Sequence, residues 1–152
     1  MNIAEILNNH PVFSKLSVKQ KKSLQSCGKN VIFNAGQIVL DQFQIADKFY
    51  ILCTGHVLLQ SISPKNKTIK IQTLSRHDIL GWSWLVPPFK WHFEAEALEK
   101  TEAIEFDGNA VKRLMENDHE FGYFLLKEFL PIIVGRLQAA RLQKIDIYGD
   151  HV

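Results

Sequence analysis

The sequence predicts a mainly β fold of the jelly-roll type with helices at both ends. Hydrophobic residues recur with a helical period near both termini, but with a period of two between about residues 30 and 107. Seven short segments of the second kind follow one another, as in an antiparallel sandwich. The length of 152 residues and the hydrophobic content of 46% suit a single core. We predict one domain over 1–152, with helices at about 2–27, a β-roll at about 30–107 and helices at about 109–147.

The first 27 residues have the pattern of short helices. Apolar residues keep a helical spacing on both sides of Pro11, which interrupts the first helix. Ser17 is a typical N-cap for a segment at 18–26, because its hydroxyl can accept a bond from an early backbone amide. Cys27 and Cys53 stand in unrelated contexts, and we interpret both as small buried residues rather than as a disulfide.

The predicted strands are short and separated by turn-prone or polar residues. The clearest is the segment 68–72, in which Ile69 and Ile71 share one face while polar residues occupy the other. The full set comprises 31–33, 38–40, 49–52, 56–62, 68–74, 93–98 and 101–106.

After residue 109 the period is helical again. Pro131 has no backbone N–H, so we expect a kink or break between segments near 119–130 and 132–147. The second segment carries an apolar stripe made of Leu130, Ile133, Leu137 and Ala140. The stripe can dock on the chain's own sheet or pair with a second copy, and we predict a homodimer through it.

Composition and motifs argue against several functions. The net charge of +2 is too small for non-specific nucleic-acid binding. The longest apolar run, 129–134, is far shorter than the roughly 20 residues of a membrane span. No secretory signal is visible, so we expect a cytoplasmic location. Phosphate-loop and zinc-protease motifs are missing and the six histidines are scattered, so we expect no enzyme activity, no metal and no cofactor.

The most informative segment is 79–97. It holds Trp82, Trp84 and Trp91 within ten residues, together with a double proline. Aromatic clusters often belong to a core, but a loop between two strands seldom carries three tryptophans only to fill space. We therefore predict a pocket here that receives a small-molecule ligand.

The order of the motifs resembles a known family over about residues 10–148. The motifs are Phe33-x2-Gly36-x2-Val39, Ala46-Asp47-x2-Tyr50-Ile51-x2-Gly55-x-Val57, Asp78-Ile79-x-Gly81 and Ala97-x5-Ala103-x2-Phe106. Together they are similar to the cyclic nucleotide-binding domains of the catabolite activator protein and of the regulatory subunits of cyclic-AMP-dependent kinase. The resemblance implies a double-stranded β-helix, a non-enzymatic role in signal transduction, and a C-terminal dimerisation helix.

The resemblance also implies where a ligand binds. In the family, a glutamate after the glycine at Gly81 holds the ribose, and an arginine before the next strand pairs with the phosphate. Trp82 takes the first place here and Trp91-His92 the second, with Lys90 as the nearest cation. Lysine cannot form the bidentate contact of arginine, so we expect no tight binding of cyclic AMP in the family manner. The predicted ligand-binding residues are Gly81, Trp82, Ser83, Trp84, Leu85, Lys90, Trp91, His92 and Arg141.

Two functions follow as alternatives. The first is a sensor that binds an altered nucleotide or an apolar anion. The second is a ligand-free interaction domain in which the tryptophan loop is packed shut and the last helix dimerises or docks a partner protein. Phe43 and His77 replace two glycines common in the family, and the chain ends four residues after Tyr148. Because a helix-turn-helix domain would need tens of residues there, we expect no direct DNA binding.

Overall fold

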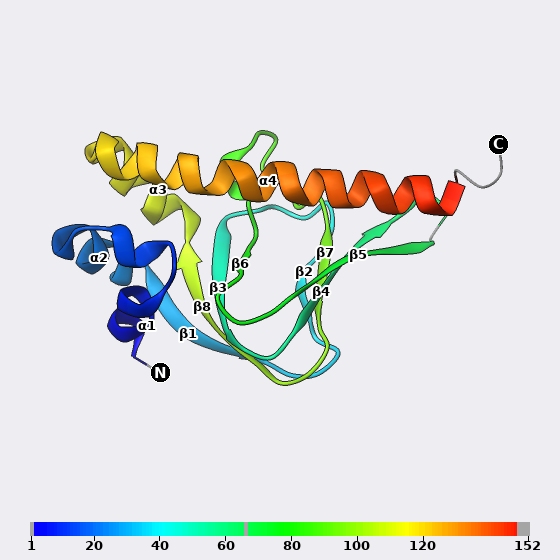
Figure 1. Cartoon of the computed structure of the whole chain (residues 1–152), viewed down its shortest axis with the longest axis horizontal. Coiled ribbons are helices and arrows are strands. Elements are labelled where there is room, and N and C mark those ends of the chain that lie inside the picture. The colour runs from blue at the N-terminus through cyan, green and yellow to red at the C-terminus, as the bar shows by residue number, and fades with distance from the viewer. Residues whose placement is uncertain (1, 66, 149–152) are drawn as a thin grey trace.

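Two antiparallel sheets face each other, and one long helix runs across their open end (Figure 1). The computed structural model describes residues 2–65 and 67–148, with side chains up to residue 143, so residues 1, 66 and 149–152 of the predicted domain lie outside it. The elements are α1 (Ile3–Asn9), η1 (Phe13–Lys15), α2 (Val18–Gln25), β1 (Gly28–Phe33), β2 (Ile38–Leu40), β3 (Lys48–Thr54), β4 (Val57–Ile62), β5 (Thr68–Leu74), β6 (Ile79–Leu80), η2 (Ser83–Leu85), β7 (Glu94–Ala97), β8 (Thr101–Asp107), α3 (Gly108–Asn117) and α4 (His119–Tyr148).

The sheets have the strand orders β1-β8-β3-β6 and β2-β7-β4-β5, and the neighbouring strands pair antiparallel. Alternation places one side of each strand in the shared core, as Ile69 and Ile71 of β5 show. The predicted jelly-roll is confirmed. Among the described residues, no helix has the length and apolar character that a membrane span requires.

The N-terminal helices follow the sequence pattern closely. Ser17 caps α2: its hydroxyl accepts from the Gln20 amide, and the Gln20 side chain accepts from the Ser17 amide. Cys27 and Cys53 are free thiols, as expected. β6 was not among the predicted strands, because two residues cannot show an alternating period. Its register is fixed by pairing of Leu80 with Tyr50 and of Ile79 with Ile51.

The predicted interruption at Pro131 is wrong, because α4 runs without a break from His119 to Tyr148 (Figure 1). Proline removes the hydrogen bond that its own nitrogen would donate to the carbonyl four residues earlier, here that of Lys127, and its ring crowds the same carbonyl. Pro131 and Lys127 are both exposed. Water can therefore satisfy the Lys127 carbonyl, and the helix continues through the proline.

The inward face of α4 is not the stripe that the sequence suggested. Buried residues follow a helical period along Phe121, Leu125, Phe129, Arg136 and Ala140. Of the predicted stripe, Ala140 lies on this inward face, whereas the side chains of Leu130 and Leu137 are 61% and 46% exposed. Ile133 packs partly against the core. Docking on the chain's own roll thus accounts for half of the stripe and leaves the other half in solvent.

Candidate ligand-binding site

A small hollow lies inside the roll where the loop after β6 meets α4. Its volume is about 10 Å3, which is about enough for a single water molecule. Leu40, Leu59 and Leu80 of the strands form its apolar base. The rest of the lining comes from the loop and from the long helix: Gly81, Trp82, Ser83, Trp91, His92, Phe93 and Arg136. The structure therefore brings together five of the nine predicted ligand-binding residues.

The two ends of the loop are held together at Ser83 and His92. The backbone amide of His92 donates to the Ser83 hydroxyl at 3.3 Å, and this hydroxyl lies 2.9 Å from His92 Nδ1. The imidazole also stacks on the Trp82 indole, with ring centroids 4.5 Å apart. Partial burial lowers the pKa of His92 below its usual value. These contacts hold Ser83, His92 and Trp82 together on the loop side of the hollow.

Gly81 is required by the same packing. Its φ is +96°, a conformation that favours glycine. A Cβ at this position would lie 3.0 Å from Cζ3 of Trp91. Trp91 is itself buried and lies over Gly81, so the loop can close against the roll only with glycine there.

Arg136 of α4 supplies the cation of the hollow. Its side chain is only 6% exposed, and its Nη2 donates to the backbone carbonyl of Ile79. Burial lowers the pKa of this guanidinium to about 10, and the Asp78 carboxylate opposes part of that shift. Arg136 therefore stays charged at neutral pH. Among the described residues it forms no ion pair with a carboxylate, which is unusual for a buried charge.

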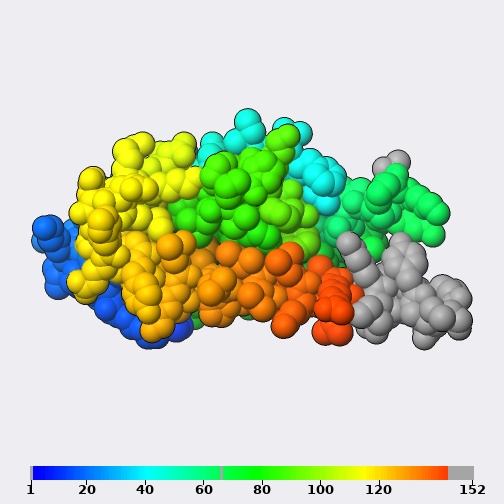
Figure 2. Space-filling model, turned by 90° about the horizontal axis from the view of Figure 1, so that it is seen from above, coloured from blue at the N-terminus to red at the C-terminus, as the bar shows by residue number. Residues whose placement is uncertain are grey.

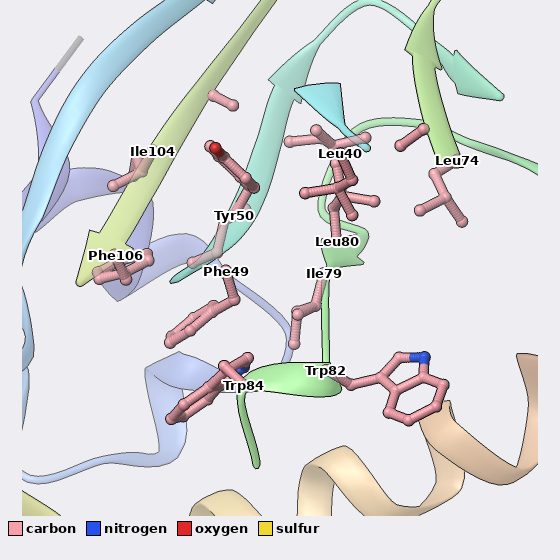
Figure 3. Packing of buried hydrophobic residues seen from close by; sticks show 14 of the residues in the cluster. Leu40, Phe49, Tyr50, Leu74, Ile79, Leu80, Trp82, Trp84, Ile104 and Phe106 are labelled. Carbon is pink, nitrogen blue, oxygen red and sulfur yellow. The ribbon is translucent and has the colours of Figure 1, made fainter. Parts of the chain in front are cut away.

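Trp84 does not belong to the hollow. Trp82 and Trp84 leave η2 in opposite directions, Trp82 toward α4 and Trp84 into the core (Figure 3). Trp84 stacks on Phe49 at 5.0 Å and meets Phe129 of α4 edge-on at 5.6 Å. Its indole Nε1 is buried and has no hydrogen-bond partner within the described part of the chain. Trp84 thus fastens the loop to α4 by packing.

The other predicted ligand-binding residues also lie outside the hollow. Leu85 packs partly against the core. Lys90 is exposed, and its backbone forms an isolated β-bridge with Ile45. Arg141 is exposed on α4. In Figure 2 the green loop segment rises beside orange α4. The sequence predicts Lys90 as the nearest cation, but the cation that lines the hollow is Arg136.

Arg136 could have been found in the sequence by extending the buried period of α4. Phe121, Leu125 and Phe129 recur every four residues, and the same face next reaches Ile132 and then Arg136. A charged residue on the buried face of an amphipathic helix is a site signal. This face was not predicted from the sequence, because Leu130 and Leu137 also belong to an apolar stripe with heptad-like spacing.

Comparison with known proteins agrees with this geometry. Residues 30–118 match the model of the cyclic nucleotide-binding domain, and the chain belongs to this family. A protein of Porphyra purpurea, ycf28, whose name places it among HTH-type transcriptional regulators, is 22% identical over 106 residues. The match covers 70% of this chain and 44% of that protein, so the chain spans less than half of this curated relative.

Solved structures share the fold at low sequence identity. A protein of Geobacter metallireducens described as a cyclic nucleotide-binding protein has a TM-score of 0.79 and 22% identity, covering 90% of this chain and 99% of that one. The sensor domain of the transcriptional regulator DNR of Pseudomonas aeruginosa has a TM-score of 0.72 and 19% identity, covering 88% and 90%. These similarities establish the double-stranded β-roll with its flanking helices.

Proposed function

We propose that the chain is a non-enzymatic regulatory module in which a small anionic ligand, a cyclic nucleotide or another anion, binds in the hollow and changes the seating of α4. The observation that carries this proposal is Arg136, a buried cation that, among the described residues, donates to one backbone carbonyl and forms no ion pair with a carboxylate. Leaving a buried charge unpaired typically costs about 3 to 5 kcal/mol. An anion in the hollow would remove that cost. Family membership supports a small-molecule ligand.

The loop holds α4 at two points, and this supports a route for the signal. Trp84 packs against Phe129, and the Ile79 carbonyl accepts from Arg136. The two helix residues are seven positions apart, about 10 Å along the axis. A ligand that competes with the Ile79 carbonyl for Arg136 would loosen the second attachment while the first holds. The C-terminal half of α4 would then move relative to the roll.

If the protein forms a homodimer through α4, this movement of the helix would change the contact between the two copies. The exposed face of the helix carries Leu126, Leu130, Val134 and Leu137 at spacings of four, four and three residues. Such spacing is typical of a seam between paired helices. The cytoplasmic location remains a prediction from the sequence.

The binding step is tested by titration with a panel of cyclic nucleotides and simple organic anions. Melting temperature and tryptophan emission are recorded together, because a bound ligand stabilises the native state by mass action and Trp82 and Trp91 line the hollow. We expect at least one anion to raise the melting temperature of the native protein but not of Arg136→Gln. Arg113→Gln removes an exposed charge on α3 and serves as the matched control. If no anion acts, the ligand-free interaction domain becomes the better description.

A further inference from the structure

The lining of the hollow restricts the kind of anion that fits. Apart from Arg136, the described side chains around it are aliphatic or aromatic. Their polar groups are the indole N–H groups of Trp82 and Trp91, the Ser83 hydroxyl and the His92 imidazole, and the last two lie within hydrogen-bonding distance of each other. Among the described lining residues there is no carboxylate that could accept from a sugar hydroxyl. The hydroxyl groups of a polar ligand body would therefore lose hydrogen bonds to water, because the described lining offers few side-chain acceptors in exchange.

The charge of the hollow is equally restrictive. Arg136 is the only Lys or Arg among the described lining residues, and Lys90 and Arg141 are exposed elsewhere. One guanidinium matches one carboxylate in bidentate geometry. A second negative charge on a ligand would have no partner among the described lining residues.

The shape of the hollow follows from Trp82. Its indole fills the space between the His92 ring, which stacks on it at 4.5 Å, and the Phe93 ring, which meets it edge-on at 6.3 Å. Trp82 precedes η2 as an N-cap residue that makes no side-chain capping bond. Among the described residues, ring contacts hold the indole in place, so a flat ring of similar character could replace it.

We propose that the hollow takes an aromatic monocarboxylate, whose ring occupies the place of the Trp82 indole and whose carboxylate binds Arg136 in place of the Ile79 carbonyl. This inference rests on the proposed function, since it names the ligand class of the same site. Binding requires the indole to swing outward, which exposes it to water. The closed hollow of about 10 Å3 is then the ligand-free form.

Four probes separate the parts of the proposal. Phenylacetate carries both the ring and the charge, acetate only the charge, phenylacetamide only the ring, and cyclic AMP tests the family ligand. We expect phenylacetate to bind at least tenfold more tightly than acetate or phenylacetamide in calorimetry, with a red shift of tryptophan emission. Arg136→Gln should weaken phenylacetate binding by at least 30-fold, whereas the control Arg113→Gln should leave it unchanged.

Trp82→Ala provides the sharpest test, because it empties the place that the ligand ring would take. An apolar cavity of this kind stays dry and binds small aromatic molecules. We expect phenylacetate to bind this variant at least fivefold more tightly than the native protein and to raise its melting temperature. Trp82→Leu is a milder version of the same change and serves if Trp82→Ala does not fold.

The outcomes distinguish the two proposals. Equal binding of phenylacetamide and phenylacetate would overturn the role of the charge, and equal binding of acetate would overturn that of the ring. Binding of cyclic AMP alone, lost in Arg136→Gln, would overturn the aromatic carboxylate and leave the proposed function intact. Binding of none of the four probes, to the native protein or to either Trp82 variant, would overturn the aromatic monocarboxylate, whereas the proposed function fails only if no anion of the wider panel acts.

Discussion

Among the described residues, three that are not glycine have positive φ, and two of them, Phe43 and His77, stand where the family commonly has glycine. Phe43 and His77 have φ values of +74° and +75°. Holding a side chain in this region costs on the order of 1 to 3 kcal/mol. The Phe43 side chain is 65% exposed, so its burial offsets little of that cost. The fold tolerates this strain because the Phe43 amide donates to the Trp91 carbonyl, which ties the strained turn to the ligand loop.

Replacing Phe43 by glycine should therefore stabilise the protein. Relief of strain outweighs the entropic cost of glycine, about 0.5 to 1 kcal/mol, and we expect a net gain of about 1 kcal/mol. For a domain of this size the melting temperature rises by a few degrees. Ile45→Gly is the matched control, since Ile45 is 72% exposed in the same turn and is not among the residues with positive φ. Ile45→Gly has the entropic cost of glycine but relieves no backbone strain, so this variant should melt at a lower temperature than the native protein.

His10 gives the stability a dependence on pH. Its Nε2 donates to the His77 carbonyl at 2.7 Å, and its Nδ1 accepts from the amides of Val12 and Phe13. The imidazole is thus neutral and buried, and burial lowers its pKa from the usual 6.5. Because the unfolded chain takes up this proton at higher pH than the folded one, stability is complete above about pH 6.5 and falls as the pH drops through the interval between the two pKa values.

Thermal melts between pH 7.5 and 5 check this expectation. The melting temperature should fall over that interval, and His10→Asn should reduce the fall, since an amide oxygen can accept from the same backbone amides without titrating. His56→Asn changes an exposed histidine and should leave the slope as it is. A slope that is the same in all three proteins would assign the effect to other groups, among them His92, whose pKa is also lowered.

At the scale of single elements, the low helix propensity of proline and the tertiary packing of α4 have opposite effects on this helix. The rule that proline ends a helix predicted two segments, but burial of Phe129 before the proline and of Arg136 and Ala140 after it holds both halves on the same roll. Tertiary packing therefore overrides the local propensity. Arg136 was missed for a related reason. The sequence pattern shows where apolar residues share a helix face, but a buried cation can be recognised only when it is known which face packs against the roll.

Pro131→Ala measures this competition. Alanine restores the amide that can donate to the Lys127 carbonyl, and proline within a helix is about 3 kcal/mol less favourable than alanine. We expect a gain of about 1 to 3 kcal/mol in the free energy of unfolding from denaturant titration, with little change in helix content by circular dichroism. Gly135→Ala is the matched control for propensity alone, because a Cβ there would meet nothing within 4 Å. Its gain should stay near 1 kcal/mol. If Pro131→Ala gained no more than this, the proline would not be straining the helix.

At the scale of the whole molecule, the roll was predictable because alternation and turn residues are local signals. The segments that became β1 to β5, β7 and β8 follow the alternating pattern within a few residues. The hollow was predictable only in part. Gly81, Trp82, Ser83, Trp91 and His92 adjoin one another in sequence, but Arg136 comes from a helix more than 40 residues further along. Its approach depends on how α4 crosses the open end of the roll, which no local pattern encodes.

The exposed face of α4 yields the last prediction. If Leu126, Leu130, Val134 and Leu137 form the seam of a homodimer, the native protein should sediment at twice its chain mass of 17.5 kDa at micromolar concentration. The double variant Leu130→Glu/Leu137→Glu places like charges opposite each other in the seam and should sediment as a single chain. Ile32→Glu introduces a charge at a 58% exposed position on β1, away from the helix, and should remain dimeric. A native protein that sediments at 17.5 kDa would show that the face is not a dimer seam. A ligand signal would then have to leave α4 by another surface.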